Sequence, residues 1–177
     1  MIKQFEEKKF NIPNLKGISE KTIAEHLKLY AGYVKNVNEL LQEKEYNRRF
    51  PFEFDGMRNH EVYFTHFGGG PQPFSSESRL AKAGFDLEKF KTMALTRGVG
   101  WAIVYYDPAS KQLLEAWVDE HHLGQLVGLS PILVLDMWEH AYFIDYTPGE
   151  KKKYVEAFFA NLNWQNVEQN FAHAIQK

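Results

Sequence analysis

Apolar residues three or four positions apart form the first regular pattern along the chain. They follow Ser19, whose short polar side chain suits a helix N-cap, and they are Ile23, Leu27, Tyr30, Val34, Val37 and Leu41. This spacing predicts an amphipathic helix from Ser19 to about residue 45. We expect a second helix after the less regular segment 48–54, and its positions include Met57, His60, Tyr63 and Phe64.

The helical pattern stops at Gly68-Gly-Gly-Pro-Gln-Pro73. Glycine and proline at this density interrupt regular structure, so the segment predicts a boundary between two parts of the chain. A glycine-rich loop can also cradle a phosphate, but no Gly-Lys-Ser/Thr follows it. The linker interpretation is therefore favoured.

Short helices and strands are expected after this boundary. Residues 80–97 have the spacing of one or two helices, and the segments 101–106 and 113–118 lie on either side of Asp107-Pro-Ala-Ser110. Two strand-like segments that flank such a turn predict a β-hairpin.

A third strand and a final helix are expected further along. The apolar run 131–135 has the length of a strand, and its composition predicts a central position in the sheet. Thr147-Pro-Gly-Glu150 matches a capping box that opens the last helix. Helices followed by a small antiparallel sheet with helices around it define an α+β protein.

Composition narrows the classes of function. The 177 residues, 44% of them hydrophobic, can bury a core in one compact unit or in two small subdomains. A net charge of −2 indicates no nucleic-acid partner, and the absence of cysteine excludes disulfides, thiolate metal sites and cysteine nucleophiles. The first residues lack an apolar signal-peptide core and no run of about 18 apolar residues occurs, so we expect a soluble cytoplasmic protein with no membrane association.

Candidate chemistry is concentrated where the third strand ends, in Asp136-Met-Trp-Glu-His140. A carboxylate and an imidazole suit iron, manganese or zinc. His26 and His60 lie on the two predicted helices, so three separate elements can direct ligands to one point. Three imidazoles and one carboxylate leave a position open on a five-coordinate ion, as a catalytic site requires.

The other histidines have a simpler interpretation. A lone histidine is more often a surface residue or a satisfied core group than a ligand, and His66 and His173 fall in this class. His60-Glu61 begins like the zinc-protease motif His-Glu-x-x-His, but the position that requires histidine is Phe64. That motif is absent.

Three motifs together resemble the signatures of the iron/manganese superoxide dismutases. They are Ser19-Glu-Lys-Thr-Ile-Ala-Glu-His26, Arg58-Asn-His60 and Asp136-Met-Trp-Glu-His-Ala-Tyr-Phe-Ile-Asp-Tyr146. Supporting matches are Phe10-Asn-Ile-Pro13, Gly98-Val-Gly-Trp101 and Asn161-Leu-Asn-Trp-Gln-Asn-Val167, so the resemblance extends from about residue 10 to about residue 170. It implies four metal ligands: His26, His60, Asp136 and His140.

The resemblance also implies a fold and a reaction. The fold is an N-terminal antiparallel helical hairpin, residues 1–68, followed by a C-terminal α/β domain, residues 74–177, with a three-stranded antiparallel sheet. One iron or manganese ion per subunit would cycle between its 3+ and 2+ states and disproportionate superoxide to oxygen and hydrogen peroxide. Zinc has no such redox couple.

Two positions near the implied site bear on the choice of metal. Iron-type members often carry Gln four residues before the second ligand, where this chain has Gly56. His121 stands where some members place a histidine, and it is expected to hydrogen-bond the metal-bound solvent. If the alignment of this loop shifts by one residue, His122 takes this role instead. The alternative is that both are exposed loop histidines without a role in the site. We expect a protein that accepts either metal, a cambialistic one.

Other matches imply a homodimer or a dimer of dimers. Glu139 matches the glutamate that reaches the partner subunit's His140, and Tyr30 and Phe143 replace a His and a Tyr that usually meet across the interface. Tyr30 adds a hydroxyl on one side of the interface and Phe143 lacks one on the other, which indicates that the contact between them has been rebuilt. The alternative is that both residues simply pack in the interface. Three aromatic residues are expected to line the cavity at the metal site or, alternatively, to form ordinary hydrophobic core: Phe64, Trp101 and Trp138.

Tyr33 is expected to be the gateway tyrosine. Family members commonly place this residue eight positions after the first ligand, in a helix with a one-residue bulge, whereas Tyr33 follows His26 by seven. In a regular α-helix a step of seven returns to within about 20° of the starting face, and a step of eight misses it by about 80°. We therefore expect a regular helix that directs Tyr33, rather than Tyr30, toward the open metal position beside His121, where its hydroxyl would relay a proton.

Two other functions are compatible with the sequence. A non-catalytic metal-binding or structural protein of the same fold would be favoured by the loss of a ligand, and none is lost. A mononuclear iron oxygenase would use two histidines and one carboxylate, which would leave His26 without a role.

Overall fold

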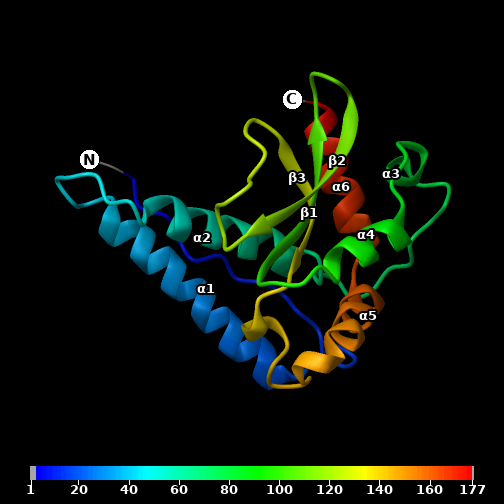
Figure 1. Cartoon of the computed structure of the whole chain (residues 1–177), viewed down its shortest axis with the longest axis horizontal. Coiled ribbons are helices and arrows are strands. Elements are labelled where there is room, and N and C mark those ends of the chain that lie inside the picture. Colours follow the sequence, from blue (N-terminus) through cyan, green and yellow to red (C-terminus); the bar gives the residue numbers. More distant parts are fainter. Residues whose placement is uncertain (1–2, 177) are drawn as a thin grey trace.

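Two long helices form the first part of the computed structural model, which describes residues 3–176. α1 (Glu20–Leu40) and α2 (Phe50–Thr65) pack together as a helical hairpin (Figure 1). Ser19 caps α1 by accepting a hydrogen bond from the Thr22 backbone N–H, as the sequence predicts. The buried face of α1 carries Thr22, His26, Tyr30, Val34 and Val37.

α2 begins earlier than the sequence predicts. Residues 50–54 form its first turns, with Pro51 at a position where no backbone N–H is needed. Glu53 is almost fully buried, and it accepts hydrogen bonds from the Arg49 guanidinium and from the Asn36 side chain of α1. These tertiary contacts hold the segment in a helix although its own sequence is irregular.

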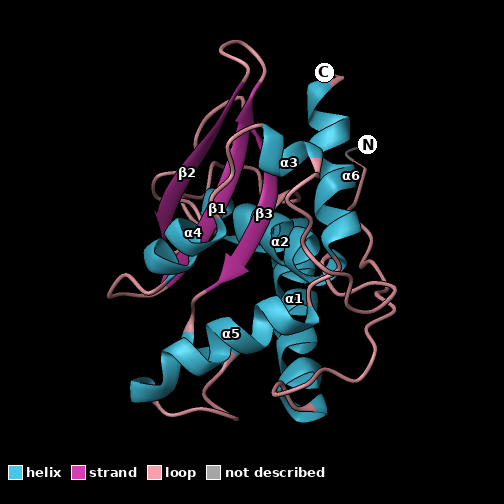
Figure 2. Cartoon of the chain, turned by 90° about the vertical axis from the view of Figure 1, so that its right-hand side faces the viewer, coloured by secondary structure: helices cyan, strands magenta, loops and turns pink. Residues whose placement is uncertain are grey.

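The three strands form one antiparallel sheet in the order β2-β1-β3. β1 (Gly100–Asp107) and β2 (Gln112–Asp119) are the predicted hairpin, and β3 (Ser130–Asp136) pairs with the other side of β1. The prediction of a central position for 131–135 is therefore wrong. β3 is apolar because α2 and α6 (Trp164–Ile175) pack on it (Figure 2), so an edge strand is buried like a central one.

His66, directly after α2, covers part of the edge of β3. Its Nε2 accepts a hydrogen bond from the Val134 backbone N–H at 3.0 Å. An edge strand otherwise presents unpaired backbone groups that favour pairing with another chain. His66 is completely buried, and burial lowers its pKa to about 3. The ring is therefore neutral at physiological pH and can accept this bond.

Short helices complete the fold. α3 (Arg79–Lys82) and α4 (Leu87–Ala94) confirm the prediction of helix in 80–97, and α4 packs on β1 and β2. The predicted capping box between Thr147 and Glu150 is present. It opens a 3-10 turn, Pro148–Glu150, which leads into α5 (Lys151–Asn161).

α5 and α6 are separate helices, whereas the sequence predicts one. Asn163 caps α6, because its Oδ1 accepts a hydrogen bond from the Gln165 backbone N–H at 3.0 Å. Its Nδ2 donates to the Gly68 carbonyl at 2.8 Å. The break between the two helices is therefore anchored to the glycine-rich segment that follows α2.

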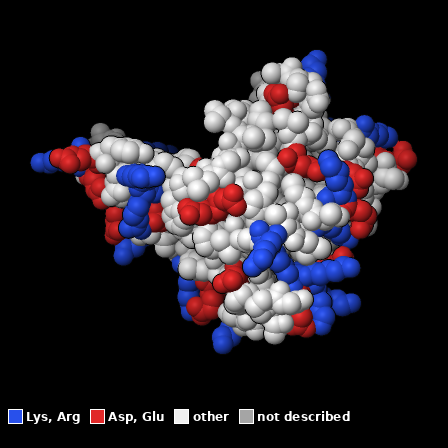
Figure 3. All heavy atoms as spheres, in the orientation of Figure 1, with Lys and Arg blue, Asp and Glu red and all other residues white. Residues whose placement is uncertain are grey.

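Acidic and basic side chains are interspersed on the face of the molecule in Figure 3. Neither sign dominates, so this face has no continuous basic patch of the kind that binds nucleic acid. No helix among residues 3–176 is long and apolar enough to cross a membrane.

We predict that His66 makes the fold sensitive to acid. In the unfolded chain this ring takes up a proton below its ordinary pKa of 6.5, whereas in the folded chain it stays neutral to about pH 3. Stability that is fully present above pH 6.5 should therefore fall with pH, by ~2 kcal/mol from this group between pH 6.5 and pH 5. Urea unfolding of His66→Gln, whose amide oxygen can still accept the Val134 bond, should show a smaller loss than the parent.

The exposed His173 provides the matched control, since His173→Gln should lose as much stability as the parent over the same interval. Equal losses for His66→Gln and for the parent would contradict the prediction.

Candidate metal centre

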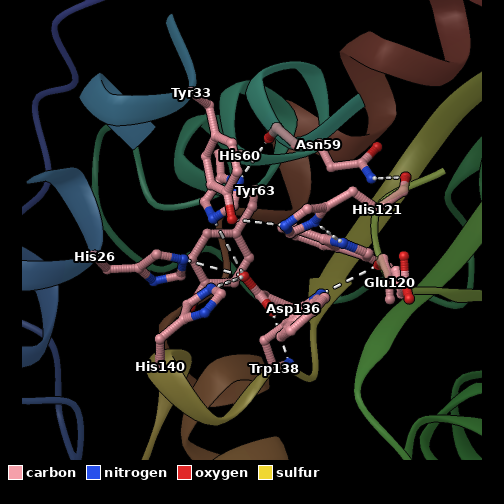
Figure 4. A network of polar contacts seen from close by, with 12 residues as sticks. His26, Tyr33, Asn59, His60, Tyr63, Glu120, His121, Asp136, Trp138 and His140 are labelled. Carbon is pink, nitrogen blue, oxygen red and sulfur yellow. Dashed lines mark hydrogen bonds and ion pairs between the residues drawn. The ribbon is translucent and has the colours of Figure 1, made fainter. Parts of the chain in front are cut away.

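Four side chains from separate elements converge at one point (Figure 4). His26 comes from α1, His60 from α2 and Asp136 from the end of β3, while His140 lies in the 3-10 turn Glu139–Ala141. One potential ligand atom of each lies within 4.8 Å of the others. The first three side chains are completely buried, and that of His140 is 20% exposed. The structure thus brings the four predicted ligands together.

Asp136 lies at the centre of this cluster. Its Oδ2 is 3.1 Å from Nε2 of His26, 3.1 Å from Nε2 of His140 and 3.6 Å from Nε2 of His60. Its Oδ1 accepts a hydrogen bond from the Trp138 backbone N–H at 2.8 Å. Burial alone would raise the pKa of this carboxyl, but the neighbouring imidazoles hold it well below its usual range. The carboxylate is therefore ionised and fixed in direction.

The backbone of α2 holds His60 in one tautomer. A carbonyl can only accept a hydrogen bond, so the 2.6 Å contact between Nδ1 and the Gly56 carbonyl places the ring proton on Nδ1. Nε2 then carries a lone pair, and this buried atom has no hydrogen-bond partner among residues 3–176. Burial lowers the pKa of both His60 and His26, which keeps the two rings neutral.

These features fit a bound metal ion. Metal ligands are deprotonated carboxylates and neutral imidazoles, and a ligating histidine commonly donates its other N–H to a carbonyl or a carboxylate. Asp136 and His60 meet these conditions. Nitrogen and oxygen donors in this combination suit iron and manganese.

Tyr33, His121 and Trp101 form a hydrogen-bonded chain beside the cluster. The Tyr33 hydroxyl is 2.7 Å from Nε2 of His121, and the Trp101 indole N–H donates to Nδ1 of the same ring at 2.9 Å. Burial lowers the pKa of His121 to about 4, so the neutral ring has a single N–H. Because the indole can only donate, this hydrogen is on Nε2 and points to the Tyr33 oxygen. The Tyr33 hydroxyl hydrogen is then free for another acceptor.

The chain of hydrogen bonds through Tyr33, His121 and Trp101 bears on the role expected for His121. Its Nδ1 accepts from Trp101 and its Nε2 donates to Tyr33, so the ring has no second N–H for a solvent molecule. Tyr33 is the member with a hydrogen left to donate. His122 lies elsewhere, with its Nδ1 3.9 Å from the Glu120 carboxylate. Of the two adjacent histidines, the structure places His121 beside the candidate ligands, with its ring 5.8 Å from that of His60.

α1 is an uninterrupted α-helix, as the seven-residue step from His26 to Tyr33 predicts. The Tyr33 ring accordingly lies 5.1 Å from that of His60. Gly56 leaves room for this arrangement, because a Cβ there would be 2.9 Å from Cδ1 of Tyr33 and 3.2 Å from Cδ2 of His121. A glutamine side chain at this position is therefore incompatible with Tyr33 and His121 where they stand.

Three aromatic side chains enclose the cluster, namely Phe64, Trp101 and Trp138. The ring centroids of Phe64 and His26 are 4.9 Å apart, as are those of Trp101 and His60. Trp138 stacks on His121 at 4.9 Å. These residues line the site and also pack in or against the hydrophobic core, so the two interpretations of their sequence positions are compatible.

Tyr30 and Phe143 are not brought to one surface. Tyr30 is completely buried; its hydroxyl oxygen accepts a hydrogen bond from the Lys8 backbone N–H at 2.9 Å and lies 3.4 Å from a Glu61 carboxylate oxygen. Phe143 is 42% exposed, and Glu139 is also exposed. The Tyr30 hydroxyl is therefore engaged inside its own subunit.

Tyr154 is a neighbour of the site that the sequence did not predict. Its hydroxyl donates to the Asp136 backbone carbonyl at 2.8 Å and lies 3.1 Å from the Tyr63 hydroxyl. This contact ties α5 to the end of β3. An aromatic residue on a predicted helix is also typical of ordinary core, so no local signal distinguished it.

Comparisons with known proteins agree with this geometry. A family model described as iron/manganese superoxide dismutases, C-terminal domain, matches residues 83–170. An iron superoxide dismutase of Aquifex aeolicus is 32% identical over 191 residues, which cover 92% of this chain and 88% of that protein. A Mn/Fe superoxide dismutase of Aeropyrum pernix is 30% identical over 173 residues, covering 85% and 80%.

A manganese superoxide dismutase of Halobacterium salinarum is 36% identical over a shorter stretch of 118 residues, covering 63% of this chain and 58% of that protein. The similarity to the first two proteins extends over most of both chains. This chain therefore belongs to the iron/manganese superoxide dismutase family.

Proposed function

We propose that the protein is a superoxide dismutase, which converts superoxide to oxygen and hydrogen peroxide with one iron or manganese ion held by His26, His60, Asp136 and His140. The observation that carries the proposal is the convergence of three imidazole nitrogens and one carboxylate oxygen within 4.8 Å. When bound, the metal supplies the one-electron couple that both oxidises and reduces superoxide. Family membership supports the same reaction.

The chain's own residues set the charge and the direction of the ligands. Asp136 contributes one negative charge, and the Trp138 backbone N–H orients it. The Gly56 carbonyl orients His60 by accepting its Nδ1–H. This contact raises the basicity of the imidazole, whereas the N–H donated to Asp136 lowers that of the carboxylate, and both tune the reduction potential of the ion that the ligands bind.

Tyr33 supplies a proton to the reduced substrate. Peroxide formation consumes protons, and the hydroxyl hydrogen of Tyr33 is not used by His121, whose own N–H points to the Tyr33 oxygen. That N–H stabilises the oxygen after the proton leaves. The aromatic enclosure by Phe64, Trp101 and Trp138 restricts the approach to small anions and keeps bulk water away from the ligands.

The site accepts either iron or manganese. Its donor set suits both ions. Gly56 with His121 departs from the glutamine arrangement common in iron-type members. The relatives include proteins named for iron, for Mn/Fe and for manganese.

The protein assembles as a homodimer or as a dimer of dimers. Exposed Glu139 is adjacent to the ligand His140, and Phe143 adds an exposed apolar surface to the same segment. A carboxylate in this position can accept the N–H of the partner subunit's His140. Tyr30, whose hydroxyl is buried, takes no part in the contact. Each subunit divides at the glycine run into parts 1–68 and 74–177.

Asp136→Ala should lose the metal. The change removes the one carboxylate and leaves three imidazoles without an anion, so metal retention should fall roughly 10-fold or more. Elemental analysis of the purified protein measures this, with superoxide consumption assayed on the same sample. Asp107→Ala, at the far end of β1, should retain metal and activity. Full metal content in active Asp136→Ala would exclude the ligand set.

Tyr33→Phe should keep the metal but lower turnover by roughly 10-fold or more, since it removes a proton donor. It should also change the affinity for azide, which probes access of small anions. Tyr46→Phe is the matched control because Tyr46 is 81% exposed between α1 and α2. If Tyr33→Phe had the turnover and azide inhibition of the parent, Tyr33 would have no part in the reaction.

Glu139→Ala should weaken dimerisation and cost roughly 10-fold or more in activity or metal affinity, because a ligand histidine loses its acceptor. Sedimentation velocity over a range of concentrations measures the dimer. Glu45→Ala, in the exposed loop after α1, should behave like the parent. A parent protein that is active as a monomer would refute the shared site.

A further inference from the structure

A tight loop after β2 carries His121. The Asp119 backbone N–H donates to the Leu123 carbonyl at 2.9 Å, and the Leu123 N–H donates back to Asp119 at 3.1 Å. His121 is fully buried inside this loop, whereas Leu123 is 50% exposed. The loop therefore turns one side chain into the protein while its own backbone runs at the surface.

The backbone directly before His121 is strained. Glu120 has a φ of 52°, in the left-handed region that non-glycine residues seldom adopt. Such a conformation persists only where the surroundings hold it. One restraint is visible, because the Trp138 indole N–H donates to the Glu120 carbonyl at 3.1 Å.

The backbone carbonyl of His121 accepts hydrogen bonds from two side-chain amides. Nδ2 of Asn59 donates to it at 3.2 Å, as Figure 4 shows, and Nε2 of Gln125 donates at 2.9 Å. The same Nε2 is 3.2 Å from Oδ1 of Asn59, which accepts from it. The Tyr105 hydroxyl donates to Oε1 of Gln125. Gln125 therefore links its own loop to both α2 and β1.

These two elements also surround the ring of His121. Asn59 precedes His60 on α2, and Tyr105 lies on β1, which carries Trp101. The backbone of His121 is thus anchored to the elements that provide a metal ligand and the indole partner of its Nδ1. Its ring hydrogen bonds of 2.7 and 2.9 Å depend on this anchoring, since hydrogen bonds weaken steeply when the geometry shifts.

We propose that Gln125 is a positioning residue, which together with Asn59 holds the His121 carbonyl and so directs the ring between Trp101 and Tyr33. This inference rests on the proposed superoxide dismutase activity. Gln125 acts through His121 and does not touch the metal ligands. Its two donated hydrogen bonds, rather than its bulk, are the feature that matters.

Two substitutions separate donation from packing. Gln125→Ala removes the side chain, whereas Gln125→Glu keeps its shape and replaces the donating nitrogen by an acceptor. Both should bind a full complement of metal and be fully folded in the absence of urea. Both should lose turnover by roughly 3- to 10-fold, less than the ~10- to 100-fold typical of a direct partner of a ligand. Both should also shift the azide dissociation constant, read from the absorption spectrum of the oxidised metal-loaded protein.

Gln112→Ala is the matched control, because Gln112 is exposed at the opposite end of β2. It should equal the parent in turnover and azide binding. A Gln125→Glu protein that matched the parent in both at a pH where its carboxyl is ionised would overturn the proposal, since a carboxylate cannot donate to the His121 carbonyl.

A double-mutant cycle tests whether Gln125 acts through the His121–Tyr33 pair. In a Tyr33→Phe background, Gln125→Ala should cause little further loss of turnover, because the ring that it aims no longer has a hydroxyl to support. If the loss of turnover in the double variant equalled the product of the losses in the two single variants, the proposal would be overturned. A metal-loaded parent that consumed no superoxide would instead refute the proposed function, so the two failures are distinguishable.

Discussion

An ionised carboxylate in a fully buried position is the constraint on which the structure depends. A buried charge is costly unless charged or hydrogen-bonding partners surround it. Asp136 has such partners in the imidazoles of His26 and His140 and in the Trp138 backbone N–H. These groups come from α1 and from the turn after β3, so the helical hairpin and the sheet must meet at this point. Ion binding there would add its free energy to that of folding.

The geometry around the carboxylate is mutually dependent. A regular α1 brings Tyr33 over His60, which is possible because Gly56 has no side chain. The space then admits the ring of His121, and Trp101 fixes its tautomer. Changing any one of these residues alters the room or the hydrogen bonds available to the others. The shortened spacing after His26 is therefore part of a coordinated arrangement.

Burial gives the histidines of this protein different chemical roles. His26 and His60 are neutral and direct nitrogen atoms at a carboxylate, whereas His121 links an indole to a phenol. His66 is neutral for the same reason, but it accepts a backbone N–H at the edge of β3. Low solvent access keeps each ring uncharged, and the neighbouring donors and acceptors then decide what it does.

The sequence by itself determined the α+β class, the hairpin of strands, the four converging residues and the face of Tyr33, because each depends on local spacing or on motifs. Only the tertiary structure decided that β3 is an edge strand, since burial by α2 and α6 makes an edge as apolar as a centre. It also decided that Tyr30 is buried inside its own subunit and that His121, rather than His122, lies beside the four converging residues. Asn59 and Gln125 meet at the His121 carbonyl from distant positions. Contacts of this kind leave no periodic signal, because they depend on how separate elements pack.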